Sequence, residues 1–198
     1  MIRIPALLAA LALAGPAFGA AGTDPDWPCI QRKQPHLSLA QVWSGPVPDE
    51  ATEALARDRQ INLLAERLEQ RRLPMAEAEA DIASFAAGAD ADQLVALMAA
   101  IFSKVERDRS ALIAGIARYG SAQVALAARI EGHRARMAEL EAADSPDFDA
   151  IDAEETALDW EMRIFTERQQ SLTYVCETPV ILEQRLFALG RVIQSHLD

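Results

Sequence analysis

The stretch that decides the fold is residues 94–140, LVALMAAIFSKVERDRSALIAGIARYGSAQVALAARIEGHRARMAEL. Its large apolar side chains recur every three or four residues, with one histidine in the same series. They are Leu94, Met98, Ile101, Val105, Leu112, Ile116, Tyr119, Leu126, Ile130, His133, Met137 and Leu140. This spacing predicts a long helix whose apolar face forms a seam with another helix. Asp90 and Gln93 fit a capping box at its start.

A second series with the same spacing follows and predicts the return helix. Its members are Ile151, Leu158, Met162, Phe165, Leu172, Cys176, Leu182, Leu186, Leu189, Ile193 and Leu197. Ser145 and Pro146 fit an N-cap and a first helical position. The two series predict a long antiparallel hairpin of coiled-coil type in which residue i lies opposite residue ~290−i, because both helices rise equally. Gly120 and Pro179 are the two places where a helix would end or kink.

Two shorter helices are expected before the hairpin. One apolar series runs from Asp49 to Leu73, ahead of Pro74, and another runs from Met75 to Gly88. Their apolar faces need a partner, so we expect them to pack on the hairpin as a four-helix base. The thinner remainder, roughly 121–170, is called the arm below. The sequence therefore predicts an all-α fold with a helical domain over 49–198.

The N-terminus indicates export. Arg3 precedes an apolar run of roughly ten residues, which is followed by Gly15, Pro16 and several small residues. This order predicts a signal peptide over 1–20 and a periplasmic or secreted protein. The alternative is a retained signal anchor, but a spanning helix needs ~20 apolar residues, and no later segment is uniformly apolar.

Cys29 and Cys176 are the two cysteines of the chain. In an oxidising compartment they are expected to form one disulfide, the alternative being two free buried thiols. Their wide separation does not fit a CxxC redox motif.

Residues 21–48 differ from the rest because they hold five prolines together with Trp27 and Trp43. Prolines at this density forbid a long helix. We expect an extended strap, stapled by Cys29, whose tryptophans dock on the helices. An exposed aromatic ligand site is the alternative.

The charge of the chain bears on its partners. The net charge is −11 and would become −12 on loss of Arg3 with the signal. An acidic protein repels nucleic acid and anionic membrane surfaces, so neither is expected as a partner.

Trp160 and Ile164 are the candidate contact residues. They lie four residues apart, on one helical face, and outside the seam series. Two large apolar groups there indicate a surface for a protein partner or for self-association. The alternative is that the base or the strap buries them.

Metal and catalytic motifs are not found. The acidic residues over 144–155 lack the glycine and glutamate positions of a calcium loop and fit helix capping. His36, His133 and His196 lie far apart, and no metal site is expected. No nucleophile elbow or phosphate loop occurs, so no catalytic residue and no cofactor is predicted.

Two short segments carry a family resemblance. Asp26, Trp27, Pro28 and Cys29, then Trp43, Ser44, Gly45 and Pro46, resemble the start of uncharacterised exported helical proteins of proteobacteria, and Val175, Cys176, Glu177 and Pro179 resemble them loosely. The resemblance implies periplasmic residence and cysteine pairing, and it implies no activity.

These observations favour a non-enzymatic periplasmic interaction or scaffold protein that presents a helical hairpin. A holdase-like chaperone using the same arm is the first alternative. A small-ligand binder or enzyme with a polar pocket near Trp43 and Tyr174 is the second.

Overall fold

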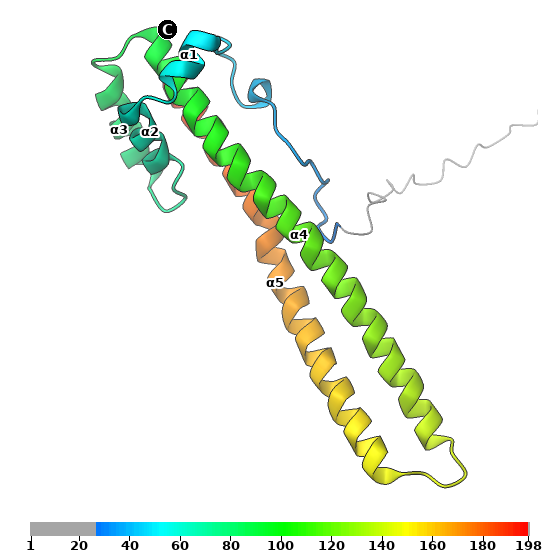
Figure 1. Cartoon of the computed structure of the whole chain (residues 1–198). Coiled ribbons are helices and arrows are strands. Elements are labelled where there is room, and N and C mark those ends of the chain that lie inside the picture. Colours follow the sequence, from blue (N-terminus) through cyan, green and yellow to red (C-terminus); the bar gives the residue numbers. More distant parts are fainter. Residues whose placement is uncertain (1–26, 198) are drawn as a thin grey trace, which may run out of the picture.

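The computed structural model describes residues 27–197, and this part of the chain is all-α (Figure 1). Its elements are the 3-10 turn η1 (Leu39–Gln41) and the helices α1 (Glu50–Leu55), α2 (Arg59–Leu68), α3 (Met75–Ala86), α4 (Ala91–Glu141) and α5 (Phe148–Gln194). The predicted signal peptide over 1–20 lies outside the described residues.

Helices α4 and α5 form the predicted antiparallel hairpin. Neither is interrupted, since α4 continues through Gly120 and α5 through Pro179. The register is the expected one: Arg129 Nε donates to Glu161 Oε1 at 2.8 Å, which is the residue that the pairing rule places opposite it.

The helix starts agree with the sequence at α4 and differ at α5. The Asp90 carboxylate accepts from Gln93 N at 2.8 Å, and the Gln93 amide oxygen accepts from Asp90 N at 3.0 Å, which completes the capping box. Helix α5 begins at Phe148, with Asp147 as N-cap accepting from Ala150 N at 3.1 Å. The prediction of Ser145 and Pro146 in these positions is wrong, because the Asp147 carboxylate supplies the cap two residues later.

The first predicted short segment is divided in two. Helix α1 ends after Leu55, and α2 begins after Asp58, whose carboxylate accepts from Gln60 N at 2.8 Å and Ile61 N at 3.3 Å. Asp58 therefore provides a second N-cap inside what the apolar spacing alone indicated as one helix.

The core of the molecule lies at the base. Helices α1 and α2 pack on α4, and α3 packs on α5. The side chains that this packing buries come from α2, α3, the first turns of α4 and the last turns of α5, and include Ile61, Leu68, Ile82, Leu97, Met98, Ile101, Leu186, Leu189 and Ile193. The strap contributes Val42 and Trp43 to the same core.

The strap runs beside α4 towards the base (Figure 1). The predicted disulfide Cys29–Cys176 fastens its start, with the two Cα atoms 5.6 Å apart. Cys176 and its neighbour Ile113 are buried but do not belong to the core cluster of the base. The disulfide thus marks the border between base and arm.

Helix α4 also meets a simple test for a membrane span. An 18-residue window in it reaches a mean hydropathy of 1.2. This result concerns length and composition only, and 28% of the window is buried inside the fold.

Candidate functional site

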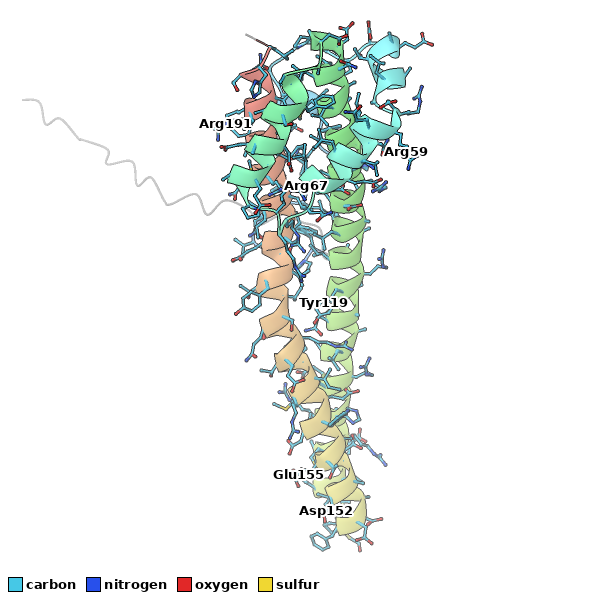
Figure 2. The ribbon with its side chains drawn as sticks, turned by 90° about the vertical axis from the view of Figure 1, so that its left-hand side faces the viewer. Arg59, Arg67, Tyr119, Asp152, Glu155 and Arg191 are labelled. Carbon is cyan, nitrogen blue, oxygen red and sulfur yellow. A yellow bond between two sulfur atoms is a disulfide. The ribbon has the colours of Figure 1, made fainter. Side chains whose placement is uncertain are left out.

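The seam between α4 and α5 is less apolar than its sequence series indicates. Below the base, polar side chains join the two helices at successive levels: Arg109 with Glu183, Tyr119 with the Arg168 carbonyl, Gln123 with the Phe165 carbonyl, Arg129 with Glu161, and His133 with Glu154. Tyr119 lies on α4 at the upper end of the arm (Figure 2). Polar groups inside a coiled-coil seam fix the register of the helices because only one alignment pairs them.

His133 joins two carboxylates of α5. Its Nδ1 is hydrogen-bonded to Glu154, and its Nε2 lies 3.7 Å from Glu161 Oε2. Glu161 also accepts from Arg129 Nε at 2.8 Å. These side chains are partly exposed, so the cluster ties the two arm helices together without being sealed from water.

Arg109 is the most deeply buried charge, with 2% of the residue exposed. Its Nε and Nη2 each lie 2.7 Å from Glu183 Oε1, and its Nη1 lies 3.9 Å from Glu106 Oε2. The Arg109 Nη1 also donates to the Pro35 carbonyl of the strap at 3.5 Å. Arg109 therefore connects α4, α5 and the strap at one level.

Trp160, the first candidate contact residue, stays 60% exposed on the arm. Ile164, one turn away, is half-buried at the edge of the seam. Trp160 lies sixteen residues before Cys176, which is about 24 Å along α5 at 1.5 Å per residue, so neither the base nor residues 27–48 of the strap reach it. Of the two expectations for this pair, the exposed surface is the one that the structure supports at Trp160.

A groove lies on the arm, on a different face of α5 from the one that carries Trp160. It measures about 310 Å³ and is lined by Ile130 and Arg134 from α4 and by Met162, Phe165 and Thr166 from α5, among others. Met162 was expected inside the seam, but it is 40% exposed at this groove. The reason is that Glu161 holds the inward position through its contacts with Arg129 and His133.

A serine, a histidine and a carboxylate meet where the strap crosses α4. Ser110 Oγ lies 3.2 Å from His36 Nδ1 and donates to Glu106 Oε1 at 2.9 Å, and His36 Nδ1 lies 3.1 Å from the same Glu106 atom. A nucleophilic triad needs the serine and the acid on opposite nitrogens of the imidazole. Here both approach Nδ1, and Ser110 Oγ also lies 3.2 Å from the Pro35 carbonyl oxygen, so the group holds the strap on α4.

Trp43 and Tyr174, the pair proposed to line a ligand pocket, are not brought together. Trp43 is buried beside an open groove of about 410 Å³ formed with Phe187, Gly190 and Gln194. Tyr174 does not line this groove and is 77% exposed. The Trp43 indole N–H donates to the Pro46 carbonyl at 2.8 Å, which fits the docked-strap expectation for this residue.

The acidic residues of the tip and the histidines do not come together as a metal site in the part of the chain that the structure describes. Asp152 and Glu155 lie near the end of the arm (Figure 2), and both are exposed. Across residues 27–197, no group of three or more His, Cys, Asp or Glu side chains has the geometry to hold a metal ion.

The polar residues of the seam are what sequence reasoning missed. Arg109 follows Val105 by four residues and Glu161 follows Leu158 by three, so both continue the apolar series. Extending the series through polar residues at the same spacing would have found them. The predicted series contained apolar side chains and one histidine only.

Comparison of the chain with known protein families, with curated proteins and with solved structures finds no match.

Proposed function

We propose that this is an exported, non-enzymatic interaction or scaffold protein that presents its helical arm to a protein partner in the periplasm. The observation that carries the proposal is the exposed indole of Trp160 on the arm, away from the base. Exposed tryptophans are enriched among the residues that dominate protein–protein binding.

The build of the arm supports this function. The seam contacts of Arg129, Gln123 and His133 hold α5 against α4 over the length of the arm. A binding face on a rigid helix loses less conformational freedom on docking than one on a loop does. The arm therefore offers Trp160 in a fixed position.

The test is crosslinking in the intact cell. A photoreactive residue at Asp159 or Arg163, both exposed and next to Trp160 in the helix, should capture one defined protein. The same probe at Arg118, which is exposed on α4 and does not line the groove at Met162, serves as the control position. Trp160→Ala should reduce the capture from Asp159, whereas Tyr174→Ala, which removes another exposed aromatic of α5, should not. Recovery of the monomer alone at every arm position would contradict the proposal.

A holdase-like chaperone is the second candidate, and the groove at Met162 favours it. Flexible methionine side chains adapt to many apolar partners. This function predicts that the purified protein suppresses aggregation of unrelated unfolded clients and that Met162→Gln weakens the suppression. A scaffold for one partner predicts no suppression and capture of the same partner under all growth conditions.

A further inference from the structure

A groove with apolar and basic side chains lies at the base, between the strap, α1 and α4. It measures about 710 Å³, which is within the ~300–1,000 Å³ typical of small-molecule sites. Its apolar side chains come from three elements: Leu39 and Val47 from the strap, Ala56 beside α1, and Ala99, Ala100 and Phe102 from α4. The small side chains of Ala99 and Ala100 leave the space open above the helix.

Basic side chains also line the groove. They are Arg57, Lys104 and Arg107, against the single acid Glu53. The whole chain has 30 acidic and 19 basic residues, so the groove has the opposite sign from the molecule. An anion is therefore repelled by most of the surface and attracted here.

The three basic side chains differ in whether they already form an ion pair within the protein. Lys104 pairs with Glu66 at 3.1 Å, and Arg107 pairs with its chain neighbour Asp108 at 3.2 Å. Within residues 27–197, Arg57 forms no ion pair. Arg57 lies in the exposed turn between α1 and α2, where its guanidinium can receive a carboxylate without breaking another contact.

The polar groups of the walls decide what kind of chain fits. The backbone N–H and C=O groups of α4 are used within the helix, and the Asn62 amide donates to the Ala56 carbonyl at 3.2 Å. A peptide would bring an N–H and a C=O at every residue and would leave many of them without partners. An alkyl chain has no such groups and needs only the apolar floor.

From the groove and its charges we infer that the base binds a single-chain anionic amphiphile, of the class of fatty-acid carboxylates. The alkyl chain lies over Ala99, Ala100 and Phe102, and the carboxylate pairs with Arg57 at the rim, with Arg107 as a second cation. This ligand site is separate from the arm and does not depend on the partner proposed for Trp160.

The experiment is isothermal titration of the disulfide-bonded protein with dodecanoate, below the concentration at which dodecanoate forms micelles. One dodecanoate per chain is expected. Dodecanol, which has the same chain without the charge, should bind at least about fivefold more weakly, since a partly exposed ion pair contributes roughly 1 kcal/mol. Equal binding of the alcohol, or tighter binding of a glutamate-rich peptide than of dodecanoate, would overturn the inference.

Three variants locate the site. Ala99→Phe should abolish binding by filling the groove, and Arg57→Ala should weaken it about fivefold. Arg59→Ala removes a nearby cation at the start of α2 (Figure 2). Arg59 does not line the groove, so this variant should leave binding unchanged. Because Arg57 is exposed, its variant keeps the test decisive even where Ala99→Phe fails to fold. If Arg59→Ala weakened dodecanoate binding as much as Arg57→Ala does, the effect would come from the general positive charge of this region and not from a carboxylate site at Arg57.

Discussion

Single charged side chains join elements that are far apart in the sequence, and Arg185 shows this most clearly. Its Nε donates to the Leu68 carbonyl at 2.8 Å, and its Nη1 donates to the Leu73 carbonyl at 2.9 Å. These bonds satisfy the end of α2 and the turn before α3 from a position on α5. Partial burial lowers the pKa of the guanidinium, because desolvation disfavours its charged form.

Arg185→Met should therefore lower the free energy of unfolding by about 2 kcal/mol, since two carbonyl oxygens lose charged donors. Urea denaturation followed by circular dichroism measures the change. Arg163→Met, at an exposed position of the arm, is the matched control and should change it by less than about 0.5 kcal/mol. Equal effects of the two variants would contradict this role of Arg185.

Glu69 is a residue whose charge opposes folding. Burial raises the pKa of its carboxyl above the ordinary value of 4.5, repulsion from Asp108 adds to the effect, and Lys104 and Arg107 oppose it. A raised pKa means that the folded state binds the proton more tightly than the unfolded state. Stability from this group is therefore fully present below the unfolded pKa and is lost as the pH rises through the folded pKa.

Glu69→Gln should accordingly stabilise the protein at pH 7, by up to about 1 kcal/mol for a partly exposed charge. The gain should shrink towards zero near pH 3, where the wild-type carboxyl is protonated in both states. Thermal unfolding of the two proteins across this pH range gives the comparison. A gain that is constant with pH would show that the charge is not its cause.

At the scale of elements, the strap and α5 approach each other closely at Gly190. A Cβ atom placed there would lie 2.9 Å from the Val42 carbonyl oxygen. By contrast, a Cβ at Gly132 in α4 would meet no atom within 4 Å. Both glycines lie in helices, but only at Gly190 does a neighbouring atom leave no room for a side chain.

Gly190→Ala should lower the free energy of unfolding by about 1–2 kcal/mol, because the strap must move away from α5. Gly132→Ala should raise it by about 0.5–1 kcal/mol, because alanine is the better helix former. Chemical denaturation of both variants measures the pair. The same sign for both would refute the close contact as the cause.

The sequence predicted the elements well where a single signal was enough. Apolar spacing gave α4, α5 and their register, and the capping box at Asp90 gave the start of α4. It did not divide α1 from α2, because Asp58 acts as a cap in the middle of a continuous apolar series. It also missed Arg109 and Gln123, because only apolar side chains and one histidine were followed along the series; their partners, such as Glu183, lie distant in the sequence.

At the scale of the molecule, the disulfide lies between two parts that are stabilised differently. The base depends on the docked strap, whereas the arm depends on the contacts between α4 and α5. Reduction, or Cys29→Ser, should loosen the strap and the core around Trp43 while α4 and α5 stay helical in the arm. The loss in stability is at most about 5 kcal/mol for a bridge between residues 147 apart, in the chain-entropy view.

Hydrogen exchange of the oxidised and reduced proteins tests this division. Amides of 27–48 and of α1 should lose protection, and amides in the middle of α4 should keep it. Loss of protection throughout the arm would show that base and arm do not unfold separately.

The arrangement of the whole molecule was only partly readable in advance. The packing of the short helices on the hairpin follows from the need to cover apolar faces, although the base holds five helices rather than the expected four, because the first short segment is divided into α1 and α2. The all-α fold follows from composition and spacing. The groove at Arg57 was not foreseen, because it arises where three separate elements leave space between small side chains. No periodicity along the chain describes such a space. The exposed position of Trp160 was one of two expectations, and distance along α5 decided between them.

The bridge between Cys29 and Cys176 also makes a covalent ring of everything between them, including the whole tip of the hairpin. A protease that cuts once in the turn at 142–147 would therefore release nothing. The two pieces would migrate as one species on a gel until a reductant is added, and the nicked protein would keep its mass, its helices and its exposed tryptophan.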